Sequence, residues 1–163
     1  MRKNIVAGNW KMNGTREEAM KLTVEIRDMV GDLNNISSEI LLAPPFVHLA
    51  SVVQLLKGTK ISVAAQNCST EASGAFTGEV SAQMIASTGA SHVIIGHSER
   101  RKLFLESEEI LKRKVSQAHN SGLKVIYCIG ESKEQRESGE FKDVILHQLN
   151  TGIFEINDVN ANN

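Results

Sequence analysis

The chain has 163 residues, 41% hydrophobic and 23% charged, which suits one globular domain built around a single core. Its formal net charge is -1, with basic residues scattered among acidic ones, and this balance disfavours nucleic acid or an anionic membrane as the main partner. No apolar run is long enough to cross a bilayer, and residues 1–4 lead into strand sequence instead of a signal peptide. We therefore expect a cytoplasmic protein with a small-molecule partner.

The first predicted unit is a strand followed by a helix. An apolar run at residues 5–7 ends in a loop, and Thr15 with Glu18 three residues later forms a capping-box pattern that starts a helix. The helical spacing predicts a buried stripe, made of Ala19, Leu22, Ile26, Met29 and Val30.

Two further strand–helix units follow. A run at residues 40–43 stops at two prolines, which cannot donate to a strand ladder, and a helical pattern covers residues 46–56. The next run, residues 61–65, leads through a loop of small residues to a short helix near residues 80–85. These segments predict two more parallel strands, each followed by a helix.

The fourth run, residues 93–95, is continuous and β-branched, as is typical of a strand covered on both faces. It ends at Gly96 and delivers His97 to the start of a polar, helix-competent turn. The positive end of a helix disfavours a second positive charge, so this histidine is expected to stay neutral and to donate a hydrogen bond. That position suits an electrophile, although a plain capping histidine is the more common alternative.

The last predicted elements lie between Ser107 and residue 149. Ser107 is a suitable cap for a helix that ends near Gly122, and a fifth strand is predicted at residues 125–129. A highly charged helical turn and an amphipathic helix over residues 141–149 follow. The polar, turn-rich residues 157–163 are predicted to form a connector.

The two cysteines, Cys68 and Cys128, lie at the ends of apolar runs. They lack the spacing with other cysteines or histidines that a metal site needs. We expect reduced thiols and no metal site.

Alternating strands and helices with short links predict parallel strands, in either an open doubly wound sheet or a barrel. The chain length favours the open sheet, because an eightfold barrel usually needs about 250 residues. The polar residues that follow nearly every strand favour a barrel, in which the strand ends line one mouth. These residues are Asn9, Lys11, Gln66, Asn67, His97 and Glu131.

Five segments together resemble the triosephosphate isomerase family, in the family's order and approximate spacing. They are residues 8–13 (GNWKMN), 43–46 (APPF), 74–79 (GAFTGE), 95–101 (IGHSERR) and 128–131 (CIGE). The resemblance implies a (β/α)8 TIM barrel, in this chain an incomplete one with about five parallel strands and their helices, in a single partial domain over residues 1–163. It also implies a homodimer that interconverts dihydroxyacetone phosphate and glyceraldehyde 3-phosphate through an enediolate, in glycolysis and gluconeogenesis, without a cofactor.

The resemblance assigns catalytic and substrate-binding roles to five residues. Lys11 resembles the lysine that faces the substrate phosphate, and Asn9 resembles its substrate-side neighbour. His97 resembles the electrophile that polarises the substrate carbonyl. Glu99 resembles the acidic residue that can pair with Lys11, and Ser98 the residue that contacts the resting base. The alternatives are a solvated loop lysine and ordinary first-turn helix residues.

The loop at residues 74–79 resembles the one that reaches into the partner subunit. The resemblance therefore places Thr77, Gly78, Glu79 and Arg100 at a dimer interface, with Glu79 and Arg100 bridging the two subunits. A merely flexible glycine-containing loop is the alternative.

Two features of the family are missing from the sequence. The family's base is a glutamate in a Glu-Pro motif after the sixth strand, but the only prolines of this chain are Pro44 and Pro45. The Gly-Gly pair of the phosphate site is also missing. We expect a fragment that stops where the sixth strand starts, and that is marginally stable and inactive alone.

Two other interpretations stay open. The first is a catalytically dead remnant that binds phosphate or assembles with another subunit. The second is an open-sheet phosphate-binding protein of flavodoxin type, for which the bulky Trp10 makes the first loop a poor phosphate cradle.

Overall fold

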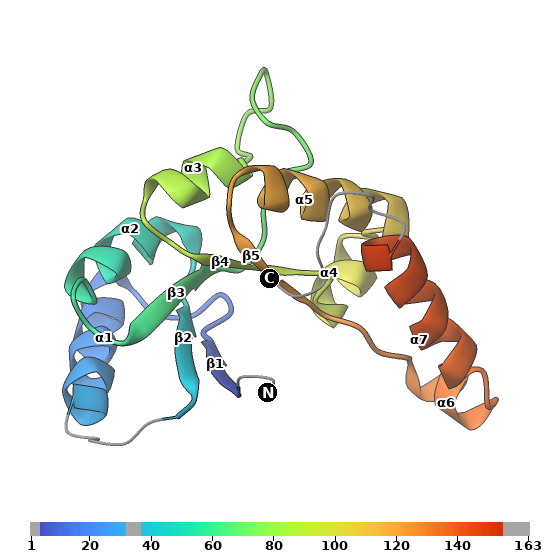
Figure 1. Ribbon diagram of the computed structural model, residues 1–163, viewed down its shortest axis with the longest axis horizontal. Helices are drawn as coiled ribbons and strands as arrows, with labels where there is room; N and C mark the ends of the chain where they lie inside the picture. Colours follow the sequence, from blue (N-terminus) through green and yellow to red (C-terminus); the bar gives the residue numbers. More distant parts are fainter. Residues whose placement is uncertain (1–3, 32–36, 155–163) are drawn as a thin grey trace.

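The computed structural model describes residues 4–31 and 37–154. Within them, five parallel strands form one sheet in chain order. They are β1 (Ile5–Asn9), β2 (Glu39–Ala43), β3 (Ile61–Ala65), β4 (His92–Ile95) and β5 (Lys124–Tyr127). The sheet curls, and helices cover its convex side (Figure 1). A flavodoxin-type sheet has the order 2-1-3-4-5 instead, so the strand order excludes that alternative and confirms the incomplete barrel.

The helices follow the strands as the alternating pattern predicts. They are α1 (Arg16–Gly31), α2 (Phe46–Leu55), α3 (Ala82–Ser87), α4 (Ser98–Leu103), α5 (Glu108–Asn120), α6 (Lys133–Glu137) and α7 (Phe141–Leu149), with a π-helical turn, η1 (Asn150–Phe154), after α7. The fifth strand ends at Tyr127, two residues earlier than predicted. The predicted connector at residues 157–163 lies outside the described residues.

Helix α1 begins at the predicted capping box. The Thr15 backbone N–H donates to Glu18 Oε2 at 2.8 Å, and the Glu18 N–H donates back to Thr15 Oγ1 at 3.4 Å. The predicted apolar stripe is wrong in part, because Leu22 is 41% exposed and Met29 61% exposed. The helix instead buries the face that carries Ala19 and Thr23, and the Thr23 hydroxyl is satisfied there by donating to the Ala19 carbonyl at 2.7 Å.

The core has two layers because successive strand residues point to opposite faces of the sheet. The larger layer lies between the strands and the outer helices and includes Leu42, Val63, Ile85, Val93 and Leu111. The smaller layer lies on the concave face and consists of Leu41, Ala43, Ala64 and Ile94, with Ile126 and Cys128 against it. All four residues of β4 are buried, as predicted for a strand covered on both faces.

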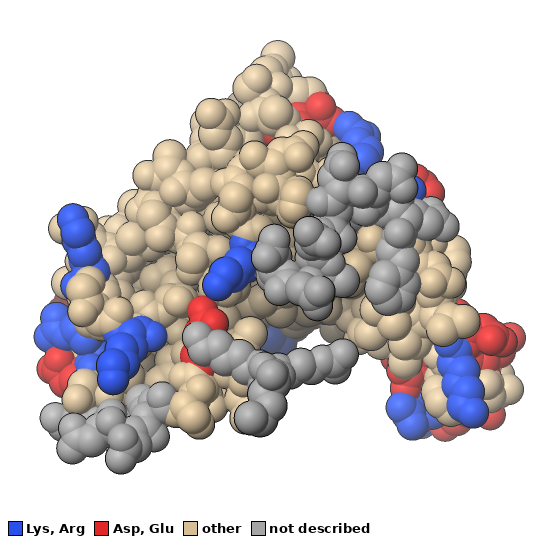
Figure 2. All heavy atoms as spheres, in the orientation of Figure 1, with Lys and Arg blue, Asp and Glu red and all other residues tan. Residues whose placement is uncertain are grey.

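β1 forms one edge of the sheet. Its residues Ile5 and Val6 are 50% and 61% exposed, so apolar side chains are uncovered at this edge. Among the described residues, every helix is too short or too polar to cross a bilayer. On the face drawn in Figure 2, acidic and basic side chains intermix over α1 and over α6.

Candidate active site

The carboxyl ends of β1, β3 and β4 border one cleft of about 660 Å³. Parallel strands of a barrel end at the same rim, so residues that follow separate strands can meet there. The cleft lining includes Asn9, Lys11, His97 and Glu99, four of the residues to which the sequence assigns a role. Ser98 is exposed at the first position of α4.

Lys11 lies in the loop after β1 with a φ of 54°, a left-handed backbone conformation that is uncommon outside glycine. Its backbone N–H donates to Asn9 Oδ1 at 2.9 Å. Its ammonium donates to Glu99 Oε1 at 2.5 Å, and this hydrogen bond holds the pKa of the Glu99 carboxyl below its ordinary value of 4.5. Glu99 is therefore ionised at neutral pH and keeps the ammonium at the cleft.

Gln66, the residue after β3, supports the left-handed Lys11 backbone. Its Nε2 donates to the carbonyl oxygens of Lys11 at 2.9 Å and Ala43 at 2.8 Å. The sequence identifies Gln66 as a polar residue that follows a strand but indicates no role for it. Its spacing carries no motif, and both partners are backbone atoms that no sequence pattern identifies.

His97 is the N-cap of α4, and its Nδ1 accepts a hydrogen bond from the Glu99 backbone N–H at 3.2 Å. An accepting Nδ1 carries no proton, so a neutral imidazole in this geometry carries its proton on Nε2. The neutral, electrophilic role expected of His97 stays a prediction. Glu99 thus contacts Lys11 through its carboxylate and His97 through its backbone N–H, and its Oε2 also lies 3.6 Å from His97 Nδ1.

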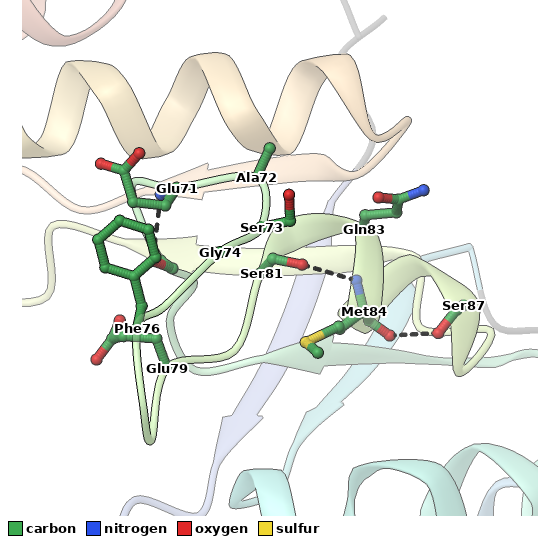
Figure 3. A pocket seen from close by; sticks show the side chains of 11 residues that line it. Glu71, Ala72, Ser73, Gly74, Phe76, Glu79, Ser81, Gln83, Met84 and Ser87 are labelled. Atoms are coloured by element: carbon green, nitrogen blue, oxygen red, sulfur yellow. Dashed lines mark hydrogen bonds between the residues drawn. The ribbon is translucent and has the colours of Figure 1, made fainter.

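The residues predicted at a dimer interface lie apart from this cleft, except for Arg100. Thr77, Gly78 and Glu79 belong to the loop between β3 and α3, which projects from the body of the molecule (Figure 1). The base of this loop and α3 enclose a second hollow of about 370 Å³, beside Phe76 (Figure 3).

Arg100 lines the cleft, and its Nε donates to Glu106 Oε1 at 2.7 Å. This bond lies within one chain, so the contact of Glu79 with Arg100 across two subunits stays a prediction.

A buried ion pair connects the rim of the cleft to α5. Lys114, which is 5% exposed, donates to Glu106 Oε1 at 2.5 Å and to Asn67 Oδ1 at 2.8 Å. Breaking such a pair leaves an uncompensated buried charge, so these residues fix the loops after β3 and α4.

Both cysteines are free thiols. Burial raises the pKa of the Cys68 thiol to about 11 and also raises the pKa of Cys128. Neither is a thiolate at neutral pH, so neither is a candidate nucleophile. Among residues 4–31 and 37–154, no group of three His, Cys, Asp or Glu side chains is placed to hold a metal ion.

The family model described as triosephosphate isomerase matches residues 4–163. The chain belongs to the triosephosphate isomerase family. Triosephosphate isomerases from Porphyromonas gingivalis and Bacteroides fragilis are each 49% identical over 156 residues, which cover 96% of this chain. The chain spans 62% and 61% of the length of these two relatives.

A crystal structure of the triosephosphate isomerase from Bartonella henselae also resembles this chain. It superposes with a TM-score of 0.83 at 40% sequence identity, over 93% of this chain and 61% of that one. This similarity agrees with five parallel strands in barrel order.

Proposed function

We propose that this chain supplies the electrophile and the phosphate-facing cation of a triose-phosphate isomerase. The reaction interconverts dihydroxyacetone phosphate and glyceraldehyde 3-phosphate by moving a proton between adjacent carbons through an enediolate. The observation that carries the proposal is the meeting of Lys11, His97 and Glu99 in one cleft, from loops after two different strands. Membership of the triosephosphate isomerase family supports the same reaction.

His97 is the electrophile in this proposal. Its Nε2–H donates to the substrate carbonyl oxygen, and that bond strengthens as negative charge develops on the enediolate oxygen. A neutral histidine in this role is the arrangement for which this enzyme family is the standard example. The same imidazole then passes its proton between the two substrate oxygens, which a fixed Nδ1 acceptor bond to Glu99 allows it to do without rotating.

Lys11 faces the substrate phosphate and the developing charge, with Asn9 beside it. Its side chain is 52% exposed, so the ammonium is accessible to an anion, and Glu99 limits where that ammonium can lie. Ser98 contacts the resting base. We assign the base to the glutamate of the family's Glu-Pro motif, a motif that the sequence does not contain.

We further propose a homodimer that acts in the cytoplasm, where glycolysis and gluconeogenesis use both triose phosphates. The interface comprises Thr77, Gly78, Glu79 and Arg100. Large apolar side chains are exposed near these residues. Phe76, on the loop that carries Thr77, is 47% exposed, and Met12, which lines the cleft together with Arg100, is 94% exposed. Exposed apolar surface of this kind marks interaction sites. Sedimentation measurements test the dimer, and Glu79→Lys is expected to weaken it.

A coupled isomerase assay tests the activity, on the chain itself and on a chimera that appends the C-terminal part of the Porphyromonas gingivalis relative. We expect turnover by the chimera, reduced at least about 10²-fold by Lys11→Ala and by His97→Ala, because each removes a transition-state interaction. Lys21→Ala, at an exposed position of α1, is the matched control and should not change the rate. A folded chimera without turnover, or with turnover indifferent to both substitutions, would contradict the proposal.

A further inference from the structure

The guanidinium of Arg101 lies against the turn that carries His97. Arg101 belongs to α4, and its side chain is only 16% exposed. Its Nε donates to the Gly96 carbonyl at 2.7 Å, and its Nη2 donates to the Cys128 carbonyl at 3.1 Å. Both carbonyls lie just past the last paired residues of β4 and β5. One side chain therefore connects these two strands at the point where their backbone ladder ends.

The guanidinium also contacts side chains of α5 and β5. Its Nη1 forms an ion pair with Glu108 Oε1 at the start of α5. The other oxygen of Glu108 accepts a hydrogen bond from the Tyr127 hydroxyl at 2.9 Å, and that hydroxyl lies 3.4 Å from Arg101 Nη2. A planar fork with several fixed partners loses little freedom when it binds, so Arg101 is a rigid support.

The turn at Gly96 packs closely against the Arg101 guanidinium. Gly96 has a φ of 80°, and a Cβ built on it would lie 2.9 Å from the Cys128 carbonyl oxygen and 3.0 Å from Arg101 Nη2. The Gly96 carbonyl that accepts from Arg101 belongs to the peptide bond between Gly96 and His97. The bond from the Glu99 N–H to His97 Nδ1 is 3.2 Å long, at the upper end of the usual range, so a small shift of this peptide breaks it.

We propose that Arg101 is a positioning residue for His97, which fixes the imidazole as the Nε2-protonated tautomer by holding the Gly96 carbonyl against the end of β5. The tautomer matters because only Nε2–H can serve as the electrophile, so the catalytic meaning of this role rests on the proposed isomerase function. The competing interpretation is that the Arg101 contacts stabilise the fold and leave the imidazole unaffected.

Nitrogen NMR of the His97 ring separates the two interpretations without any assay of activity. In the unmodified 163-residue chain, Nδ1 should resonate as an unprotonated nitrogen and Nε2 as a protonated one at neutral pH. In Arg101→Met, the two resonances should move toward each other, as expected for an imidazole that exchanges between tautomers. Tyr127→Phe is the matched control, because it removes a half-buried hydroxyl from the same cluster and keeps the guanidinium; its His97 signals should match the unmodified chain.

Circular dichroism and thermal unfolding check that each variant is folded. If Arg101→Met does not fold, Arg101→Lys replaces it: the ammonium keeps a charge beside Glu108 but cannot bridge two carbonyls as a fork does. A folded variant with unchanged, fully separated His97 nitrogen resonances overturns the proposal.

The chimera with the C-terminal part of the Porphyromonas gingivalis relative provides the kinetic counterpart. There, Arg101→Met should lower kcat by roughly 10- to 100-fold with KM changed much less, because misplacing the electrophile weakens the transition state more than substrate binding. A chimera that is inactive before any substitution counts against the proposed function, whereas the NMR comparison still decides the role of Arg101.

Discussion

The Lys11 ammonium lies 2.5 Å from Glu99 Oε1, although 88 positions separate the two residues in the sequence. Lys11 follows β1 and Glu99 follows β4, and two other strands lie between them in the sheet. In a flat sheet, three strand spacings would separate these strand ends by about 14 Å. The pair therefore depends on the curl of the sheet, and the partial barrel is sufficient to assemble this side of the cleft.

The pKa of Glu99 should report this pair directly. The hydrogen bond from Lys11 lowers the pKa of Glu99 below 4.5, so Lys11→Met should return it toward that value. Because the pKa is lower in the folded chain, the contribution of Glu99 to stability is present above about pH 4.5 and disappears as the pH falls through the folded-state pKa. Carbon NMR of the Glu99 carboxyl measures the pKa in both chains. Lys21→Met, on α1, should leave the titration unchanged, and an unshifted midpoint in Lys11→Met would show that Lys11 does not lower the pKa of Glu99.

Gln66→Met should loosen the Lys11 loop while preserving side-chain volume. The Lys11 carbonyl loses its donor, whereas the Ala43 carbonyl keeps the Trp10 N–H at 3.1 Å. We expect the free energy of unfolding to fall by about 0.5–1.5 kcal/mol, as for one typical hydrogen bond, because water can reach the exposed Lys11 carbonyl. Urea denaturation measures the change. Gln54→Met, at an exposed position of α2, is the control, and an equal loss there would show that the hydrogen bonds of Gln66 contribute nothing specific.

The bounds of β3 could be predicted from the sequence, whereas the hydrogen-bond partners of Gln66 could not. The apolar run at residues 61–65 has bounds that match β3, because a buried strand is defined by local hydrophobicity and its end by the polar residues that follow. The partners of Gln66 are carbonyls 55 and 23 positions away, and only the assembled rim brings them together. The sequence therefore predicts that Gln66 lies at the rim, and only the structure shows what it holds.

The same limit explains the partly wrong stripe of α1. Helical spacing identifies apolar residues that share a side of the helix, but the neighbouring elements decide which part of that side is covered. Met20, Ile26 and Val30 pack against the core, whereas Leu22 and Met29 stay exposed. For the cleft, the motifs that resemble the triosephosphate isomerase family identified Lys11, His97 and Glu99, whereas the contacts of Arg101 depend on the ends of two strands and a helix that no motif connects.

Gly96→Ala and Gly58→Ala should separate backbone strain from crowding. Their φ values are nearly equal, 80° and 82°, but a Cβ at Gly58 meets nothing within 4 Å, whereas one at Gly96 meets Cys128 and Arg101 at 3.0 Å or less. We expect Gly58→Ala to cost about 1–2 kcal/mol from the left-handed conformation alone. Gly96→Ala should cost roughly 1–3 kcal/mol more, because the carbonyl and the guanidinium must move. Equal losses in denaturant unfolding would show that the turn relaxes freely and that Arg101 does not constrain it.

The titration of Tyr127 should show whether the cluster behind His97 is intact in solution. Burial, followed by the hydrogen bond to Glu108, raises the pKa of Tyr127 from 10.0 to about 12. Because the folded-state pKa is the higher one, the stabilisation is complete below pH 10 and is lost as the pH rises toward 12. Tyr127 is the only tyrosine of the chain, so tyrosinate absorbance reports it alone, and circular dichroism at each pH shows whether the chain is still folded.

Replacing the carboxylate that faces the Tyr127 hydroxyl should move this titration. In Glu108→Gln, the amide oxygen can still accept the hydrogen bond but no longer repels a tyrosinate, so the midpoint should fall toward 10. Glu109→Gln changes an exposed carboxylate one position along α5 and should leave the midpoint in place. A midpoint near 10 in the folded, unmodified chain would mean that neither burial nor Glu108 perturbs the hydroxyl, and it would contradict the packing of Tyr127 against Glu108.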